Sequence, residues 1–593
     1  MDRDNILVIA EKPSVAQAIA RVIGAYERKD GYLEGSGYRV SWCFGHLAEY
    51  AMPEAYDEKY RRWTFEDLPI VPVPWKLMVC KGKSRQVKIL KKLLSEADCV
   101  VNACDAGREG ELIFRHVIEL ANSDTRIKRL WINSMEDKEI VAGFENLKPG
   151  EEYEKLYETA VCRAKADWLV GMNLTRGFST MYDFHITVGR VQSPTLAMIA
   201  ERQAEIENFV KEPFYRVRIS GNGIVAVSEK VKDEVVADAL AERCQGKKAT
   251  VSSLRREKKY SAPPKLFDLT TLQRKANCLF GYTAQQTLNE LQAMYEAKII
   301  TYPRTDSCYV TEGMENTVRE LVSEVRDAYP ELGSEMTEVN VNQVINNKKV
   351  TDHHALLPTQ GAFGKSQDSL SAIQKNLFAM ICARLLAAVS EKKVLEETKA
   401  IVICEGHEFT ATDSVVIEPG FAAIENKFRS VAGGAKASDD TVKEQVTGVL
   451  PPGVEEGTEI DDLKAEKTKH FTMPPKPYTE DTLLSAMERA GVSDMDKDVE
   501  RKGLGTPATR AGIIEKLIYI GYVERKKKQL LPTERGKQVA DLLPDIMKSA
   551  ELTAKWENRL LDVERGNGSG EDFMLDIFTL IREVLAGLRG GKQ

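Results

Sequence analysis

Two acidic residues follow short apolar runs near the start of the chain. Glu11 comes directly after Ile6–Ala10, and Asp105 comes shortly after Cys99–Ala103. Such runs are typical of buried strands, and in a parallel sheet the working groups lie at the carboxyl ends of the strands. Carboxylates at two strand ends of one sheet can share a Mg²⁺ ion, which completes its coordination with water and phosphate oxygens. Lys12, next to Glu11, can hold a phosphate.

A tyrosine and an arginine form a second reactive group. Tyr302 and Arg304 flank one proline in the segment ITYPRTDS at 300–307. A phenol has a pKa near ~10 and is a poor nucleophile at neutral pH, so a tyrosine that acts as a nucleophile needs nearby cations to stabilise the phenolate. Arg304 and Lys12 are the candidates. Without further motifs a packed aromatic would explain the tyrosine, and N-caps or surface carboxylates would explain the acids.

Strands that alternate with helices position these residues. The run before Glu11 predicts a strand, and the apolar spacing after it predicts an amphipathic helix with Val15, Ile19, Val22 and Tyr26 on one face. A second unit repeats this pattern, with a helix marked by Val87, Leu90 and Leu94, a buried strand at 99–103 and a helix marked by Leu112, Ile113, His116, Val117 and Leu120. The alternation predicts a parallel sheet.

The periodicity changes several times along the rest of the chain. It is helical from about 150 to 210, strand-like from 214 to 260, helical from about 270 to 390, and strand-like again at 397–414. Strand-like segments on both sides of a helical excursion predict one discontinuous β domain.

The last part of the chain predicts a linker followed by a small helical unit. The Gly-rich, acidic segment 432–462 is typical of a mobile loop or linker, and TMPPKP at 472–477 is typical of a stiffer spacer. Beyond them we expect a helix at 479–490, an N-cap at Thr506 and Pro507, a helix at 508–520 and a hairpin in YVERKKKQLLPT. This order is that of a winged helix, which either binds DNA or serves only as a scaffold.

Composition excludes several classes of protein. A chain of 593 residues predicts about four domains, and 43% hydrophobic with 29% charged residues is ordinary globular usage, not that of disordered or fibrous proteins. No apolar run reaches the ~18 residues of a membrane helix, and the acidic start does not resemble a signal peptide, so we expect a cytoplasmic protein. The ten cysteines never form C-x-x-C, which leaves no legible zinc ribbon or disulfide framework.

The net charge of -7 does not indicate a nucleic-acid partner. Residues 255–275 nevertheless carry seven Lys or Arg against two acids, which is either a local binding surface or a solvated face.

Several motifs, in one order, resemble a known family. EKPS at 11–14 followed by DAGREGE at 105–111 resembles the Toprim module, and ITYPRTDS resembles the active-site tyrosine segment of type IA DNA topoisomerases. GRVQSPTLAMI at 189–199, DHHALLPT at 352–359, PPKPYTEDTLLSAME at 474–488 and GLGTPATRAGII at 503–514 complete the set. In their detailed sequence these motifs are similar to those of the bacterial topoisomerase III branch, and the resemblance covers nearly the whole chain.

The resemblance implies a multidomain fold of α/β, α and β parts arranged as a torus. We expect a Toprim domain with a parallel-sheet α/β fold at 1–150, a helical and winged-helix base at 151–213 and 470–593, a β-rich arch at 214–270 and 395–469, and a helical domain with Tyr302 at 271–394.

The resemblance also implies an ATP-independent topoisomerase III that decatenates DNA and relaxes negative supercoils. Tyr302 would attack a DNA phosphodiester, giving a 5′-phosphotyrosine and a free 3′-hydroxyl. Arg304 and Lys12 would stabilise the charge on the phosphate, and His353 would donate to the same group. Glu11 would give a proton to the leaving 3′-oxygen and recover it on religation, which requires a raised pKa.

The expected cofactor is Mg²⁺, held by Glu11, Asp105 and Glu109. Glu109 lies at a helix start, where negative charge is favoured in any case. Many relatives carry D-x-D-x-E, whereas this chain has Gly107 in place of the second acid. One ion is therefore expected rather than two. The chain has no G-x-x-x-x-G-K-[ST] motif for ATP and no cysteine-rich zinc ribbon, and the lack of the ribbon favours the topoisomerase III branch.

We expect DNA to be bound as a single strand, with its phosphates contacting Arg and Lys side chains and its bases stacked on aromatic rings. The expected strand-binding residues are Gly189, Arg190, Val191, Gln192, Ser193 and Pro194, with Arg176, Trp63 and Trp168 as further candidates. For the two tryptophans a core role is an equal alternative. The expected substrate is single-stranded or gapped DNA, and we expect a nucleoid-associated monomer, with no membrane contact, that works with a helicase or a single-strand-binding protein.

Three alternatives remain open at this point. The chain could be a relaxing enzyme of the topoisomerase I type. It could be a Toprim nuclease or primase, for which Glu11 and Asp105 would suffice and Tyr302 would be inert. It could also be a DNA clamp with a decayed site, which only Gly107 favours.

Overall fold

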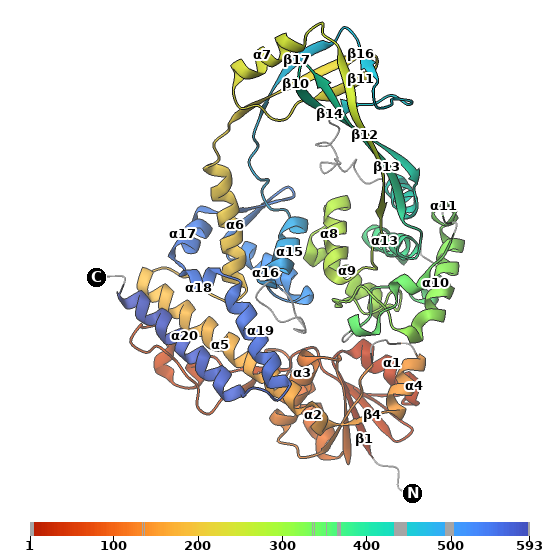
Figure 1. Ribbon diagram of the computed structural model, residues 1–593. Coiled ribbons are helices and arrows are strands. Elements are labelled where there is room, and N and C mark those ends of the chain that lie inside the picture. Colours follow the sequence, from red (N-terminus) through yellow and green to blue (C-terminus); the bar gives the residue numbers. More distant parts are fainter. Residues whose placement is uncertain are drawn as a thin grey trace.

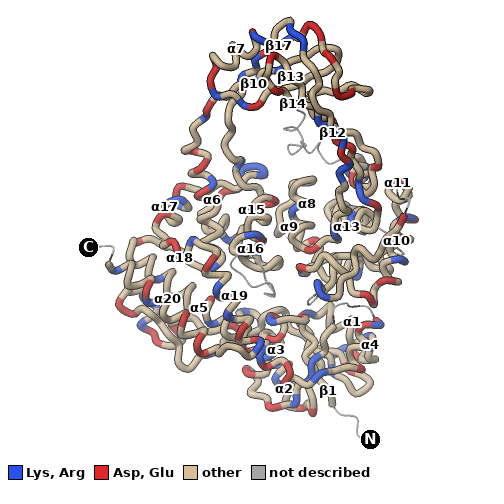
Figure 2. The backbone as a smooth tube through the Cα atoms, viewed as in Figure 1, with Lys and Arg blue, Asp and Glu red and all other residues tan. Residues whose placement is uncertain are grey.

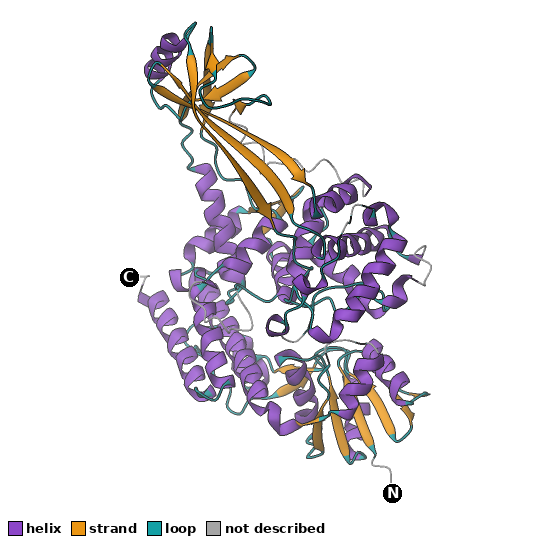
Figure 3. Cartoon of the chain, turned by 45° about the vertical axis from the view of Figure 1, so that its right-hand side comes forward, coloured by secondary structure: helices purple, strands orange, loops and turns teal. Residues whose placement is uncertain are grey.

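The chain forms an open ring in the computed structural model, with an N-terminal sheet at the bottom of Figure 1, helices on both sides and a β-rich arch at the top. The structure describes residues 5–132, 135, 137–334, 336, 338–350, 353–363, 369–431, 448–492 and 503–590. Figure 3 shows that helices dominate the body of the ring and that strands are concentrated in the arch and the N-terminal sheet.

The N-terminal sheet has a parallel centre and antiparallel edges. Within the described residues its strand order is β2-β3-β4-β1-β7-β8-β9. The strands are β1 (Ile6–Ala10), β2 (Glu27–Lys29), β3 (Tyr32–Gly35), β4 (Tyr38–Trp42), β7 (Cys99–Ala103), β8 (Arg126–Arg129) and β9 (Lys148–Pro149). The predicted parallel sheet is confirmed for β4, β1, β7 and β8. The prediction is wrong at the edges, where β2, β3 and β9 pair antiparallel. Tight turns join β2 to β3 and β3 to β4, which makes these two pairs antiparallel.

Strand β1 is buried on both faces, as its continuous apolar sequence predicts. Leu7 and Ile9 pack under α2 and α3, whereas Val8 and Ala10 pack under α1 and α4. These helices are α1 (Pro13–Ile23), α2 (Ser84–Ser95), α3 (Arg108–Ala121) and α4 (Asp137–Glu145). The expected helix face after β1 is wrong at Tyr26, since α1 ends at Ile23 with Gly24 as a left-handed C-cap, and the Tyr26 ring is 72% exposed.

The segment with Tyr302 belongs to a helical region with its own core. Its helices are α8 (Leu269–Phe280), α9 (Ala284–Glu296), α10 (Glu315–Ala328), α11 (Pro330–Gly333), α12 (Gln360–Phe363), α13 (Ala372–Ala388) and α14 (Phe421–Val431). Capping boxes at Asp268 and Ser371 start α8 and α13. Tyr302 lies in the irregular chain between α9 and α10, and its ring joins the core beneath these helices.

The base joins two distant pieces of the chain in one core. The first piece contributes α5 (Glu154–Tyr182) and α6 (Gln192–Glu207). The second contributes α15 (Glu480–Arg489), α16 (Pro507–Tyr519), β18 (Val523–Lys526), β19 (Gln529–Pro532), α17 (Glu534–Leu542), α18 (Asp545–Lys548), α19 (Glu551–Glu564) and α20 (Gly570–Gly590). The predicted helices, the cap at Thr506 with Pro507 in the first turn, and the hairpin at 522–533 are confirmed.

The arch is a sheet built from both strand-like segments of the sequence. In the described part of the chain its order is β16-β12-β13-β14-β11-β10-β17, with β15 paired to β11. The strands are β10 (Pro213–Gly221), β11 (Ile224–Val227), β12 (Ala249–Ser261), β13 (Lys393–Cys404), β14 (His407–Glu418), β15 (Gly448–Val449), β16 (Glu459–Ile460) and β17 (Lys464–Phe471).

Two expectations for the arch need correction. The segment 214–260 is not wholly strand-like, because Asp233 caps a helix, α7 (Glu234–Cys244), that packs on the sheet through Ala237 and Cys244. Residues 432–447 of the predicted linker lie outside the described residues, and 448–462 hold β15 and β16 rather than only a loop.

The basic run at 255–275 is not one basic surface. Along β12 the cations share the sheet with acids, and Lys259 pairs with Glu397 of β13. Arg274 pairs with Asp481 of the base. Figure 2 shows both signs of charge along this leg of the ring.

The smaller elements are a pair of strands and short 3₁₀ helices. Strand β5 (Ala48–Tyr50) pairs with β6 (Leu77–Val79). The 3₁₀ helices are η1 (Pro53–Ala55), η2 (Glu58–Arg61), η3 (Gly150–Tyr153), η4 (Glu312–Met314), η5 (Val341–Val344) and η6 (Asn347–Lys349). None of the helices in the described ranges is both long and apolar enough to cross a lipid bilayer.

Candidate active site

The tyrosine segment meets the carboxyl edge of the N-terminal sheet. The hydroxyl of Tyr302 donates a hydrogen bond to Oδ2 of Asp105, which follows β7. A cavity of about 400 Å³ opens at this contact. It is lined by Glu11, Asp105, Gly107 and Glu109 from the sheet side, by Tyr302, Arg304, Asp306 and His353 from the tyrosine side, and by Arg163, Asp167 and Thr506–Thr509 from the base. Three separate cores therefore contribute to one polar cavity.

Glu11 is buried beside this contact, with 5% of its surface exposed. Burial and, next, the charge of Asp105 raise the pKa of its carboxyl to about 8, although Lys12 and Arg304 act to lower it. Lys12 Nζ lies 3.9 Å from Glu11 Oε1. At neutral pH Glu11 therefore holds a proton that it can give to a leaving oxygen.

Tyr302 is also buried, and its phenol is protonated in this arrangement. Burial raises the pKa of Tyr302 well above its usual value, as do the charges of Asp105 and Glu11, and Arg304 acts in the opposite direction. The ring of His353 lies 4.3 Å from the tyrosine ring, centre to centre. Asp105 can accept the phenolic proton, so the nucleophile and a base for it are already in contact.

The neighbouring histidine, His354, has a different environment. Its side chain is buried and its Nδ1 lies 2.8 Å from the carbonyl oxygen of Ala355. Burial lowers the pKa of this imidazole to about 4, so it is neutral and packed. Between the two histidines, His353 alone lines the cavity.

The residues expected to bind metal are only partly brought together. Glu11 and Asp105 face each other, but Glu109 is 60% exposed at its side chain and pairs with His46. Within the described ranges no three His, Cys, Asp or Glu side chains are grouped closely enough to hold an ion. The two facing carboxylates fit a hard divalent cation, because their mutual repulsion is relieved when a cation lies between them.

Gly107 has a conformational reason for being glycine. It is the N-cap of α3, with φ of 146° and ψ of 175°. Backbone in this region is adopted almost only by glycine. The position that carries an acid in D-x-D-x-E is therefore shaped here as a turn into the helix, not as a place for a carboxylate.

The predicted strand-binding segment forms a buried turn at the start of α6. Arg190 is 4% exposed, and its guanidinium pairs with Asp167 at 3.0 Å and with Glu557 at 3.3 Å. The Oγ atom of Ser193 accepts from the N–H of Gly189 at 3.1 Å. Gln192, Ser193 and Pro194 are buried in the first turn, and Gly189 and Val191 are half-buried.

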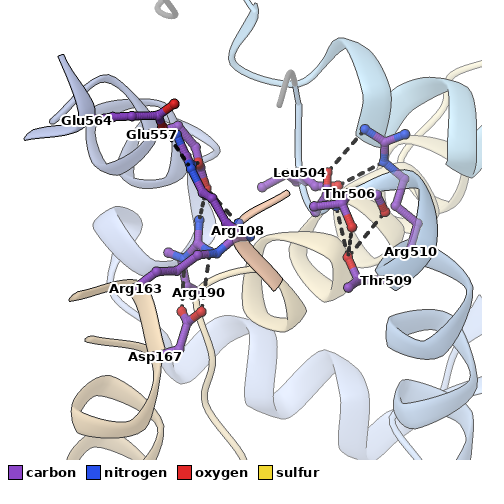
Figure 4. A network of polar contacts seen from close by, with 11 residues as sticks. Arg108, Arg163, Asp167, Arg190, Leu504, Thr506, Thr509, Arg510, Glu557 and Glu564 are labelled. Atoms are coloured by element: carbon purple, nitrogen blue, oxygen red, sulfur yellow. Dashed lines mark hydrogen bonds and ion pairs between the residues drawn. The ribbon is translucent and has the colours of Figure 1, made fainter. Parts of the chain in front are cut away.

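A network of buried charges surrounds Arg190, and the sequence motifs did not reveal its acidic centre. Figure 4 shows guanidinium groups of Arg108, Arg163 and Arg190 gathered around Glu557 of α19. Arg108 N–H groups reach Glu557 at 3.4 Å and Glu564 at 2.6 Å, and Arg163 lies 3.6 Å from Glu557. In the sequence Glu557 resembles any surface acid, since its partners lie hundreds of positions away.

The further candidates for DNA contact are packed against their neighbours. Arg176 is buried, stacks over Trp63 at 5.1 Å and donates to the carbonyl of Tyr60 at 2.7 Å. Trp168 is half-buried and packs edge-on against Trp75 at 5.3 Å. These contacts pack Arg176 and Trp168 against their neighbours, whereas Trp63 keeps 38% of its surface exposed.

Comparisons with known proteins agree over nearly the whole chain. Residues 6–135 match the family model described as the Toprim domain, and residues 151–575 match the one described as DNA topoisomerase. A relative named DNA topoisomerase 3 from Bacillus subtilis is 38% identical over 609 residues, which cover 99% of this chain and 82% of the relative. Another of the same name from Bacillus licheniformis is 37% identical over 608 residues, with the same coverage.

The fold is similar to a solved structure. Full-length topoisomerase I from Thermotoga maritima superposes with a TM-score of 0.71 at 24% sequence identity. The match covers 98% of this chain and 90% of that one.

Proposed function

Because this chain belongs to the DNA topoisomerase family and begins with a Toprim domain, we propose that it is an ATP-independent topoisomerase III. It would cut one DNA strand through a 5′-phosphotyrosine, pass another strand and reseal the first, decatenating DNA and relaxing negative supercoils. One observation carries this proposal: the hydroxyl of Tyr302 contacts Asp105 in a cavity that Glu11, Arg304 and His353 also line.

Cleavage exchanges one phosphate ester for another. The oxygen of Tyr302 attacks the phosphorus as its proton passes to Asp105, and the bond from phosphorus to the 3′-oxygen breaks. Protonated Glu11 gives its proton to that oxygen, leaving a 3′-hydroxyl. Religation reverses these transfers. Because the number of phosphate ester bonds is unchanged, no ATP is needed.

Cations next to the phenol stabilise the phosphate as charge builds on it. Arg304 lines the cavity beside Tyr302, and its charge lowers the pKa of both Tyr302 and Glu11. Lys12 lies beside Glu11, and the ring of His353 lies against the ring of Tyr302. Together they act where negative charge develops, which is the most effective place for electrostatic catalysis.

One Mg²⁺ ion, held by Glu11 and Asp105, would polarise the phosphate and help to align the cut ends. The turn at Gly107 and the pairing of Glu109 with His46 favour one ion over two. We propose no zinc and no ATP as cofactors.

The proposed substrate is single-stranded or gapped DNA, bound by a monomer on nucleoid DNA, with a helicase or single-strand-binding protein as partner. The buried turn at 189–194 would shape the strand-binding wall next to the cavity, with Arg163 and the start of α16 exposed to it.

End-labelled DNA tests this proposal. Single-stranded DNA labelled at either end is incubated with wild type or with Tyr302→Phe, quenched with denaturant and analysed for label that migrates with protein. We expect the new 5′ end to be linked to wild type only, and a Mg²⁺ titration on negatively supercoiled plasmid to show relaxation without ATP. Free nicks that form regardless of Tyr302 would instead indicate a Toprim nuclease, and retention of uncut DNA would indicate a clamp.

A further inference from the structure

A second cavity lies on the other side of Glu11 and Arg304. Its volume is about 640 Å³. It shares Glu11, Glu109 and Arg304 with the first cavity, but residues of the base do not line it. The rest of its lining comes from Lys12, Pro13, Ser14, Gln17, Phe44, Gly45, His46, Ile113 and Glu296. Glu11 and Arg304 therefore line both spaces, and only the first space reaches the base domain.

An aromatic ring is presented to this second cavity by a firmly held loop. Phe44 is 49% exposed. The backbone N–H of Cys43 donates to the Ala10 carbonyl at 2.7 Å, and that of Gly45 donates to the Glu11 carbonyl at 3.2 Å. Lys83 Nζ donates to the carbonyls of Phe44 and His46, at 2.8 and 2.7 Å. The ring thus has a fixed position relative to Glu11.

The loop conformation leaves the ring in the open. Gly45 has φ of +66°, a conformation that favours glycine, and it turns the chain directly after Phe44. The half-exposed ring lines the same cavity as Lys12 and Arg304.

The charges in the second cavity favour a nucleobase over a phosphate as its occupant. The carboxylates of Glu109 and Glu296 line it, so a phosphate group is repelled near them. Its cations, Lys12 and Arg304, belong to the side shared with the catalytic centre. A strand that crosses the centre would therefore leave its phosphate at these cations and place its base on the ring, as in other single-strand sites.

We infer which half of the cut strand enters the second cavity from the way in which the enzyme holds each half. After cleavage the 3′-hydroxyl half is held only by non-covalent contacts, whereas the other half is attached to Tyr302. The first cavity is lined in part by residues of the base domain, so it suits the 3′-hydroxyl half of the strand, which is held only by non-covalent contacts. The second cavity is left for the half that carries the 5′-phosphate.

We propose that Phe44 is a stacking platform for the first or second base on the 3′ side of the cleaved bond. This inference rests on the proposed function, because it assigns a position relative to the bond that Tyr302 attacks. It gives the enzyme a second point, besides the phosphate, at which the tyrosine-linked half is aligned before religation.

The test uses an oligonucleotide whose main cleavage site has been mapped with wild type. Abasic residues replace one base at a time on either side of that site, and affinity is measured by fluorescence anisotropy in the non-cleaving Tyr302→Phe background. Phe44→Ala should weaken binding of the intact strand about tenfold, the order expected for one stacked base. An abasic residue at the contacted 3′-side position should weaken binding equally, with no further loss when combined with Phe44→Ala.

Matched variants control the test. Phe44→Trp should retain the affinity, and Tyr26→Ala, which removes an exposed aromatic of the same domain outside both cavities, should leave it unchanged. Thermal melting checks that each variant is folded. Equal affinities of Phe44→Ala and Tyr26→Ala would overturn the inference, as would coupling of Phe44 to a base on the 5′ side. A wild type that forms no tyrosine-dependent adduct would instead refute the proposed function itself.

Discussion

Removal of the charge on Glu557 should destabilise the base of the ring. Glu557 is 2% exposed, and its carboxylate serves the guanidinium groups of Arg108, Arg163 and Arg190. Glu557→Gln keeps the shape of the side chain and removes its charge. The arginines then remain in a buried site with one carboxylate fewer, which raises their electrostatic energy.

The loss of stability in Glu557→Gln depends on the carboxylates that the three arginines keep. Loss of one partner from a buried ion pair costs about 3–5 kcal/mol. Arg108 keeps Glu564 and Arg190 keeps Asp167, so we take the lower end, about 3 kcal/mol. For a unit of about 200 residues, each kcal/mol lowers Tm by about 2–4 °C, which gives a fall of roughly 6–12 °C.

Scanning calorimetry is the assay, since the domains of a chain this long unfold as separate transitions. Asp576→Asn is the control, because Asp576 and Arg559 form an exposed pair at 2.8 Å that involves the same helix, α19. An exposed pair contributes less than about 1 kcal/mol. If both variants shifted the transition by the same amount, the argument that burial makes Glu557 important would be refuted.

Three further predictions concern the metal, the turn at Gly107 and the core. Because the pKa of Glu11 is raised to about 8, protons compete with Mg²⁺ for this carboxylate below that pH. Binding of Mg²⁺ at pH 7 should therefore release about one proton, and this release should fall towards zero above pH 9 and be abolished in Glu11→Gln. Titration calorimetry in buffers of different ionisation enthalpy measures the number of protons released. Gly107→Asp, which restores D-x-D-x-E, and Gly107→Ala should each lower the free energy of unfolding by about 1–3 kcal/mol. Neither variant should bind more Mg²⁺ ions than wild type, and a second ion bound by Gly107→Asp would contradict the conformational explanation. Trp168→Ala should lower the melting temperature of the base but leave the single-strand affinity of the folded protein within about twofold; the opposite pattern would make Trp168 a DNA contact.

The sequence predicts the elements that are buried and regular, and it misses those that are polar or weakly patterned. Strands β1 and β7 begin and end where their apolar runs do. Strand β2 is mostly exposed and carries no such signal. Helix α7 was missed because its buried face consists of the small residues Ala237 and Cys244.

For the candidate site, the motifs name residues but not their surroundings. Tyr302 and Asp105 follow from their motifs, and the structure adds that they touch. Arg190 belongs to a motif that suggests an exposed DNA contact, yet it is buried against Asp167 and Glu557. Burial of a charge depends on partners brought in by the tertiary fold, and local sequence does not encode them.

The contacts around the cavity also indicate which joint opens for strand passage. Toprim and base are joined by Arg108, which is 3% exposed and would lose both carboxylates if the two parts separated. Tyr302 meets Asp105 across a polar cavity, so their separation exposes groups that water can solvate. Parting the tyrosine domain from Toprim therefore costs less than parting Toprim from the base. We expect the cut 3′ end to stay with Toprim and the base while Tyr302 carries the 5′ end away.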